Sequence, residues 1–178
     1  GCGLGVCDDT LKIVFSLIEN STTPLVLDAD ALNCVAKQPE ILLRKKAPII
    51  ITPHPGEMSR LTGLATPLVN AERERVALDF AQKYGVVTVL KGAGTVIASP
   101  NGKVLVNPTG NSGMATGGSG DVLAGMTASI LAQGASAFSS AAAAVYLHGL
   151  AGDIAAEKYG KISMLPTDLI NCIPLAYK

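Results

Sequence analysis

Three short apolar runs, each followed by a helical pattern, constrain the fold of this chain more than any other feature. The runs cover residues 25–27, 48–52 and 86–90, and the two later ones are rich in β-branched residues. Strands that are apolar on both faces, without alternation, are typical of a parallel sheet that helices cover on each side. The pattern therefore predicts βαβ units within an α/β protein.

Helical periodicity predicts the elements that connect and follow these strands. Residues 10–18 place Leu11, Val14, Phe15 and Ile18 on one face, with Thr10 as a candidate N-cap. Further helices are expected from about residue 31, over 39–44, from 58 and over 69–84. Three Ala-rich helices close the chain, the first two separated at Gly134 and the last near residues 168–173.

A β-hairpin is predicted after the third apolar run. Residues 95–99 and 104–106 flank Pro100-Asn101-Gly102-Lys103, and Asn-Gly in that setting is a strong hairpin signal. Parallel units with an antiparallel hairpin at the edge predict a three-layer α/β/α sandwich whose sheet is mostly parallel. The length of 178 residues predicts one domain over residues 1–178.

Charge and composition argue against several classes of protein. Basic and acidic residues number 14 each, so no overall field points to nucleic acid or an anionic membrane. The four cysteines have neither zinc-type spacing nor the density of a secreted scaffold, so we expect free thiols in a reducing cytoplasm. Residues 122–152 carry no formal charge, but polar residues and glycines interrupt them. We therefore expect two buried helices there and no membrane span.

The strongest functional signal is the segment of residues 116–123, Thr-Gly-Gly-Ser-Gly-Asp-Val-Leu, which opens a helix. Small residues leave backbone N–H groups uncovered at the helix N-terminus, where the helix dipole also attracts an anion. Asp121 places a carboxylate beside that anion, which is unfavourable unless a base is needed next to a hydroxyl that attacks phosphorus. The alternative is that Asp121 caps its own helix.

Polar clusters follow each predicted parallel strand, and a fourth one lies in the glycine-rich segment. Because ligands collect beyond the carboxyl ends of the strands in open parallel sheets, we expect these clusters to form one site. The clusters are Asp28 with Asp30 and Asn33, His54 with Glu57, residues 91–95, and residues 111–121.

Each of these residues also has a structural interpretation. His54, between two prolines, either contacts a ligand or bonds a loop carbonyl. Glu57 either compensates a helix dipole or holds water and Mg²⁺ near phosphate oxygens. Lys91 either neutralises phosphate, with a nucleotide on the glycines and Thr95 beside it, or is a solvated lysine at a strand end. Asp28 and Asp30 either position a hydroxylated substrate or cap the next helix.

His148 has one favoured interpretation. It falls within an Ala-rich helix that the apolar pattern predicts to be buried. We therefore expect a structural role for this side chain. The methionines and tyrosines are expected to belong to the core.

Four segments together resemble one known family. Residues 28–33, 52–57, 91–95 and 110–125 occur in the order seen in the NAD(P)H-hydrate dehydratase family, a family of ribokinase-like nucleotide-repair enzymes. The likeness extends over essentially all 178 residues, and the last segment is the most specific.

The resemblance implies an activity. ADP, or ATP in some members, donates a phosphoryl group to the C6 hydroxyl of hydrated NADH or NADPH, and phosphate then leaves to restore the reduced ring. Such an enzyme is a hydro-lyase that uses Mg²⁺. The resemblance further implies a cytoplasmic homo-oligomer, with an epimerase domain that acts on the same metabolite as a partner.

The resemblance also implies roles for particular residues. Asp121 matches the base, residues 117–120 match the anion hole, and Glu57 matches an acidic residue that acts around Mg²⁺ through water. The residues implied to bind the hydrated dinucleotide are Gly5, Asp30, Asn33, His54, Asn111 and Asp121. Those implied to bind the nucleotide are Lys91, Gly92, Ala93, Gly94, Thr95, Gly118 and Gly120. The Asn101-Gly102 hairpin is then expected beside the nucleotide, because it directly follows residues 91–95.

Two departures from the family pattern are visible. Gly1-Cys2-Gly3-Leu4-Gly5 stands where the family usually has Gly-Pro-Gly-Leu-Gly. Family members also carry strands and helices before this loop, including part of the dinucleotide pocket. We therefore expect the chain to be the C-terminal part of a ribokinase-like catalytic domain, with the N-terminal strands missing from it.

Three other functions stay open. A vitamin-precursor or sugar kinase of the same superfamily would share Asp121 and the anion hole but release a stable phosphorylated product. A non-catalytic nucleotide-binding module would have no turnover to lose. An NAD-dependent dehydrogenase is disfavoured, because no G-x-G-x-x-G follows a predicted strand with an acidic residue about twenty positions on. ADP and ATP, and the hydrates of NADH and NADPH, also stay open as substrates.

Overall fold

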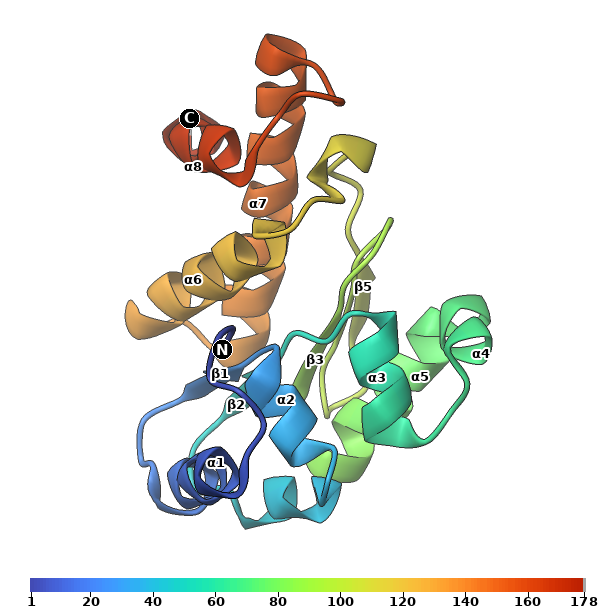
Figure 1. Ribbon diagram of the computed structural model, residues 1–178, viewed down its shortest axis with the longest axis vertical. Helices are drawn as coiled ribbons and strands as arrows, with labels where there is room; N and C mark the ends of the chain where they lie inside the picture. The colour runs from blue at the N-terminus through green and yellow to red at the C-terminus, as the bar shows by residue number, and fades with distance from the viewer. Residues whose placement is uncertain (178) are drawn as a thin grey trace.

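A mixed five-stranded sheet in the order β1-β2-β3-β4-β5 forms the centre of the structure, a computed structural model that describes residues 1–177 (Figure 1). The strands are β1 (Leu25–Leu27), β2 (Ile49–Ile51), β3 (Val87–Leu90), β4 (Val96–Ala98) and β5 (Val104–Val106). The first three run parallel, with β1 opposite β2 from Leu25↔Ile49 onward, and the last two form an antiparallel hairpin. These elements confirm the predicted α/β class, the parallel strands and the edge hairpin.

Helices cover both faces of this sheet. On one face lie α1 (Asp8–Asn20), α2 (Asp30–Val35), the 3₁₀ helix η1 (Pro39–Arg44), α3 (Pro55–Thr62), α4 (Thr66–Ala71) and α5 (Arg73–Tyr84). On the other lie α6 (Ser119–Ala132) and α7 (Ala137–Tyr159), against which α8 (Pro166–Ala176) packs, and a second 3₁₀ turn is η2 (Ser112–Met114). Within residues 1–177 no helix is both long and apolar enough to cross a membrane.

The strand β2 shows why the sheet is buried on both faces. Ile49 and Ile51 pack into the core beneath α1–α5, whereas Ile50 packs into the core beneath α6 and α7. All three side chains are at most 1% exposed. Burying a side chain of this size contributes roughly 1.5–3 kcal/mol, so an uninterrupted apolar strand stabilises both layers of helices at once.

Two predicted helices differ from the observed ones. The first begins at Asp8 with Cys7 as its N-cap, so the prediction that Thr10 caps it is wrong. The Thr10 hydroxyl instead donates to the Leu4 carbonyl at 3.2 Å and ties down the N-terminal loop. The helix predicted over residues 69–84 is divided, because Glu72 has non-helical backbone angles (φ −126°, ψ 42°) between α4 and α5.

The turn of the hairpin lies at the other end of the sheet from residues 91–95. Leu90 pairs with Val96 and Thr88 pairs with Ala98, so β4 runs back along β3 and carries Asn101-Gly102 away from the carboxyl ends of the parallel strands. The prediction that this turn lies beside the nucleotide is therefore wrong. Only the start of β4 and the end of β5 lie at the carboxyl ends of the parallel strands.

Candidate functional site

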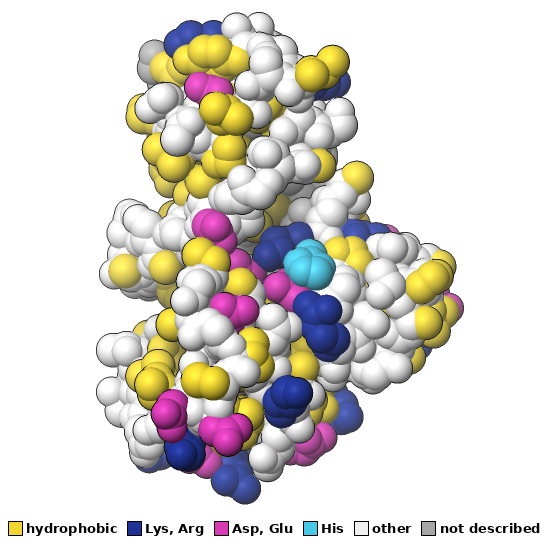
Figure 2. Space-filling view, viewed as in Figure 1, with side chains coloured by type: hydrophobic (Ala, Val, Ile, Leu, Met, Phe, Trp, Pro, Cys, Tyr) yellow, Lys and Arg dark blue, Asp and Glu magenta, His cyan; other side chains and the backbone are white. Residues whose placement is uncertain are grey.

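The carboxyl ends of β1, β2 and β3 bring one lysine and two carboxylates together. Lys91 Nζ donates to Asp28 Oδ1 at 2.7 Å and lies 3.8 Å from Glu57 Oε2. The side chains of Asp28 and Glu57 are 5% and 6% exposed, and that of Lys91 is 18% exposed. The interpretation of Lys91 as a solvated lysine is therefore wrong, because its ammonium compensates two buried carboxylates. Figure 2 shows acidic, basic and histidine side chains gathered in the middle of this face.

His54 and Glu57 cap the start of α3 reciprocally. His54 Nδ1 accepts hydrogen bonds from the backbone N–H groups of Gly56 (3.0 Å) and Glu57 (3.3 Å), and Glu57 Oε2 accepts one from His54 N (2.8 Å). Pro55 follows as the first helical residue, where its missing N–H costs nothing. The imidazole thus bonds backbone N–H groups and not a loop carbonyl. The His54 side chain is about half exposed.

Two of the predicted substrate residues are held by neighbours from other segments. Gly5 N donates to Asp30 Oδ2 at 2.9 Å, which joins two predicted substrate residues directly. Arg60 Nε donates to Asn33 Oδ1 at 2.9 Å. The N-cap of α2, Ala29, has no side-chain capping bond, so neither Asp28 nor Asp30 caps this helix.

The glycine-rich segment forms the N-terminus of α6. Gly118 is the N-cap with φ +99°, a left-handed conformation that glycine adopts without a steric penalty. Asp121 lies exposed in the first turn, and no side chain caps this helix. The alternative that Asp121 is the helix cap is therefore wrong. The hydroxyl of Ser119 is buried and has no hydrogen-bond partner within the described residues.

The N-terminal loop approaches Asp121. A hydrogen bond to the Asp121 carboxylate and the charge of that carboxylate raise the pKa of the Cys2 thiol. The loop that contains Gly5 therefore lies close to the start of α6, as well as to Asp30. The loop of residues 1–5 thus contacts Asp30 through Gly5 and lies near Asp121 through Cys2.

A cleft of about 650 Å³ lies next to this cluster, between β3, the segment after β5, and the helices α6 and α7. Lys91, Gly92, Ala93, Gly94, Thr95, Gly120 and Asn111 line it, all of them predicted site residues. Asn107, Pro108, Thr109, Gly110, Ser112, Met114, Ala115, Ser119, Leu123, Val145, His148 and Gly149 complete it. Gly118 caps the helix beside this cleft but does not line it.

Lys91 lies between the two groups of predicted residues. It lines the cleft, and its ammonium contacts the carboxylates of Asp28 and Glu57. Gly5, Asp30, Asn33, His54 and Asp121, the predicted dinucleotide contacts other than Asn111, lie outside the residues that line the cleft. The arrangement suits two ligands that meet near Lys91 and the N-terminus of α6.

The side-chain amide of Asn111 makes three hydrogen bonds within the protein. Its Nδ2 donates to the Gly152 carbonyl (3.0 Å) and to Asp153 Oδ1 (2.9 Å), and its Oδ1 accepts from Gly113 N (2.9 Å). Asp153 Oδ2 also accepts from Gly110 N at 2.8 Å. Asn111 therefore holds its loop against α7, in addition to lining the cleft.

His148 contacts the N-terminus of α6. Its Nε2 lies 2.9 Å from the Ser119 carbonyl, and the side chain is 8% exposed. Burial, and to a smaller extent the charge of Lys91, lowers the pKa of His148 to about 4, against the opposing effect of the Ser119 bond. The imidazole is therefore neutral at physiological pH and donates to Ser119, consistent with the structural role predicted for it.

Two polar side chains that bond predicted site residues, those of Arg60 and Asp153, were not predicted from the sequence. Arg60 stands three residues after Glu57, on the same side of α3, and this spacing is the one pattern that could have indicated it. Asp153 lies in a helix more than 40 residues from its partners, and its position in the sequence carries no motif.

Few side chains of the site could bind a metal directly. Residues 1–177 contain no group of three or more His, Cys, Asp or Glu side chains that could hold a metal ion. Mg²⁺ commonly takes one or two carboxylates and fills its remaining positions with water and substrate phosphates. Glu57 is the carboxylate that would orient one such water; its Oε2 lies 3.8 Å from Lys91 Nζ and its side chain is 6% exposed.

The fold and the site define an α/β protein in which a helix N-terminus and a lysine lie at one cleft. A family model described as NAD(P)H-hydrate dehydratase matches residues 1–175. The chain therefore belongs to the NAD(P)H-hydrate dehydratase family, which is ribokinase-like.

Known proteins agree with this assignment. The chain is 44% identical over 178 residues to the bifunctional NAD(P)H-hydrate repair enzyme Nnr of Thermofilum pendens. The match covers 100% of this chain and 34% of that protein. It is 42% identical over 163 residues to the ADP-dependent (S)-NAD(P)H-hydrate dehydratase of Neisseria meningitidis, over 90% of this chain and 55% of that protein.

A solved structure is similar as well. The ADP/ATP-dependent NAD(P)H-hydrate dehydratase of Bacillus subtilis, crystallised with ATP and Mg²⁺ and soaked with CoA, superimposes with a TM-score of 0.89 at 34% identity. The match covers 98% of this chain and 63% of that one. The chain thus spans about a third to two thirds of the length of the proteins it matches.

Proposed function

We propose that the protein containing this chain repairs hydrated NADH and NADPH by nucleotide-dependent dehydration. The observation that carries the proposal is the carboxylate of Asp121, which lies exposed in the first turn of α6 without capping it. Membership of the NAD(P)H-hydrate dehydratase family supplies the substrate class, and the similar proteins from Neisseria and Bacillus are named as ADP- or ADP/ATP-dependent.

In the proposed first step, Asp121 accepts the proton of the C6 hydroxyl as its oxygen attacks the terminal phosphorus of ADP or ATP. The bond from phosphorus to the bridging oxygen breaks, and AMP leaves when ADP is the donor. Backbone N–H groups at the start of α6 face the transferred phosphoryl group, and Lys91 offsets its charge.

In the second step, the C6–O bond breaks and phosphate leaves. A proton leaves the neighbouring ring carbon, which restores the reduced nicotinamide. The balance is hydrated NAD(P)H plus ADP giving NAD(P)H, AMP, phosphate and a proton. When bound, Mg²⁺ would neutralise charge on the donor phosphates, and Glu57 is the residue that would orient one of its waters.

The roles of the remaining residues belong to the same proposal. Gly5, Asp30, Asn33, His54 and Asn111 bind the hydrated dinucleotide, and residues 91–95 with Gly118 and Gly120 bind the donor nucleotide. The cleft lined by residues 91–95 and Gly120 supports the nucleotide assignment. For Asn111 the support is weaker, because its amide already makes three bonds within the protein.

The chain is proposed to be the C-terminal part of one ribokinase-like, three-layer catalytic domain, in keeping with the share of its relatives that it covers. A homo-oligomer, an epimerase domain as a partner and a cytoplasmic location are further parts of this proposal.

The test is a turnover assay on the full-length protein with hydrated NADH, in which the nicotinamide absorbance and free phosphate are followed together. We expect both to rise with ADP or ATP and neither to rise without a nucleotide. The same assay with hydrated NADPH compares the two dinucleotides. A stable phosphorylated product without recovery of absorbance would instead identify a small-molecule kinase, and nucleotide binding without turnover would identify a binding module.

A further inference from the structure

Arg73, the first residue of α5, reaches back to the carboxyl end of β3. Its Nη2 donates to the carbonyl oxygens of Leu90 (2.8 Å) and Gly94 (3.4 Å), and its Nη1 donates to that of Lys91 (3.2 Å). One guanidinium therefore holds three carbonyl groups within a stretch of five residues. A planar group with fixed donors is suited to such a task, whereas an ammonium is not.

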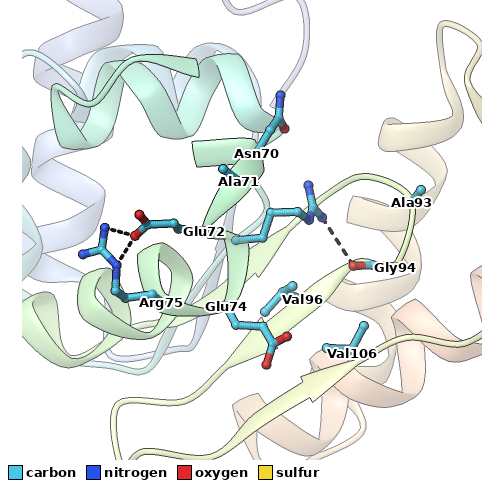
Figure 3. Close-up of a pocket in the computed structure, with 10 residues that line it drawn as sticks. Asn70, Ala71, Glu72, Glu74, Arg75, Ala93, Gly94, Val96 and Val106 are labelled. Atoms are coloured by element: carbon cyan, nitrogen blue, oxygen red, sulfur yellow. Dashed lines mark hydrogen bonds and ion pairs between the residues drawn. The ribbon is translucent and has the colours of Figure 1, made fainter. Parts of the chain in front are cut away.

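No ion pair within residues 1–177 involves Arg73. The neighbouring carboxylate of Glu72 pairs with Arg75, which also pairs with Asp79 on the exposed side of α5. Figure 3 shows the Glu72–Arg75 pair turned away from the loop that carries Ala93 and Gly94. Burial lowers the pKa of the Arg73 guanidinium, and its hydrogen-bond acceptors are the three carbonyl oxygens of the loop.

The loop is shaped around this guanidinium. A Cβ atom on Gly92 would lie 2.7 Å from Arg73 Nη1 and 3.0 Å from Nη2, and Gly92 has a φ of +146°. A side chain at residue 92 would therefore push Arg73 away from the carbonyl groups. The observed position of the Arg73 guanidinium thus requires glycine at residue 92.

The orientation of the carbonyl groups fixes that of the N–H groups that follow them. All peptide bonds here are trans, so the N–H of a peptide unit points opposite to its carbonyl. The carbonyls of Lys91 and Gly94 point at Arg73, so the N–H groups of Gly92 and Thr95 point away from it. Neither N–H has a hydrogen-bond partner within the described residues, and both residues line the 650 Å³ cleft, which Arg73 does not line.

We propose that Arg73 is a positioning residue for the donor nucleotide. By holding the carbonyls of Leu90, Lys91 and Gly94 on the α5 side, it keeps negative dipoles away from the phosphates and presents the N–H groups of Gly92 and Thr95 to them. Arg73 lines a second cleft, of about 470 Å³, between α5 and this loop (Figure 3). The inference rests on the proposed function, because it takes the ligand to be ADP or ATP.

The test compares Arg73→Met with Arg75→Met in the full-length protein. Both changes remove one guanidinium from α5, but Arg75 makes only exposed ion pairs with Glu72 and Asp79. The dissociation constant of ADP, measured by calorimetry well below the unfolding temperature, should rise at least ~10-fold for Arg73→Met, since bonds to charged groups are lost and the loop can turn. For Arg75→Met we expect less than about a twofold change.

A structural role alone predicts a different pattern. It would lower the unfolding temperature of Arg73→Met and leave ADP affinity unchanged in the folded protein, which would overturn the proposal. Steady-state kinetics give a second readout: KM for ADP should rise while KM for the hydrated dinucleotide stays the same. Equal rises in both KM values would also overturn it. If Arg73→Met does not fold, Arg73→Lys is measured in its place, and it should show a smaller loss of ADP affinity in the same direction.

The outcome separates this inference from the proposed function. Wild-type protein that binds ADP but does not dehydrate hydrated NADH contradicts the proposed function, while the affinity of the Arg73 variants still tests the role of Arg73. Wild-type protein that binds neither ADP nor ATP contradicts both.

Discussion

Lys91 Nζ lies 2.7 Å from Asp28 Oδ1, although 63 positions separate the two residues in the sequence. The contact joins the end of β3 to the end of β1 across the intervening strand β2. It places a partly buried positive charge at the mouth of the cleft and, at the same time, allows the carboxylates of Asp28 and Glu57 to be buried. The charge that is proposed to bind the donor nucleotide thus also compensates two buried carboxylates.

Asp28→Asn should destabilise the protein. The change leaves Lys91 without its closest partner in a site that is mostly closed to water, and breaking a buried pair in this way costs about 3 kcal/mol. Asp9→Asn is the control, because Asp9 pairs with Lys12 at 3.3 Å on a side chain that is 86% exposed, and should change stability by less than about 1 kcal/mol. Chemical denaturation of both variants measures the difference. Equal effects would show that the Lys91–Asp28 pair behaves as a surface pair.

Asp121→Asn should abolish most turnover without affecting stability. A general base contributes typically ~10²–10⁴-fold, so the rate should fall at least ~100-fold, while ADP affinity should hold or rise slightly as negative charge is removed. Asp168 provides the matched control, since it lies in the first turn of α8 and its Oδ2 accepts from Leu165 N at 2.8 Å. Asp168→Ala should lose about 1 kcal/mol of unfolding free energy, and Asp121→Ala should not. Near-normal turnover in folded Asp121→Asn would reject the catalytic role.

The positions of the parallel strands could be predicted because burial on two faces leaves a strong pattern. Ile49, Ile50 and Ile51 must all be apolar, whichever core each one faces. The gathering of the polar clusters followed from the same prediction, since parallel strands end at one edge. Lys91 and Asp28 were expected at that edge, but their direct pairing depends on strand order, which the sequence did not specify.

The contacts that escaped prediction depend on tertiary approach and not on local pattern. Arg73 bonds backbone carbonyls 17 to 21 residues away, and carbonyl groups are present at every position, so no residue type marks them. The break at Glu72 could not be seen because its neighbours on both sides favour helix. The hairpin turn was placed at the wrong end because closeness in sequence was taken for closeness in space.

Two helical glycines should respond in opposite directions to replacement by alanine. A Cβ on Gly149 would lie 2.8 Å from the backbone carbon of Thr109, whose hydroxyl donates to the Tyr146 carbonyl at 2.9 Å, so the loop cannot yield easily. Gly149→Ala should cost about 1–3 kcal/mol and weaken ADP binding, because this loop lines the cleft. Gly125 has open space around it, so Gly125→Ala should stabilise α6 by about 0.5–1 kcal/mol. Thermal unfolding compares the two, and a loss of stability in both would contradict the assigned packing.

His148 should make stability depend on pH below neutrality. Burial lowers the pKa of His148 from 6.5 to about 4, so the unfolded chain takes up a proton on this residue at a higher pH than the folded protein does. Its contribution is fully present above pH 6.5 and is lost as the pH falls towards 4, by roughly 3 kcal/mol in all, since one pKa unit corresponds to about 1.4 kcal/mol.

His148→Gln isolates this effect from that of the carboxylates, which titrate in the same range. Glutamine keeps an N–H donor that can reach for the Ser119 carbonyl but carries no titrating group. The free energy of unfolding of the wild type, minus that of His148→Gln, should therefore decrease steadily between pH 6.5 and pH 4, whatever its value at pH 7. A difference that stays constant over this interval would mean that the imidazole is hydrated or charged in the folded protein. It could then not act as the neutral donor that holds Ser119 at the start of α6.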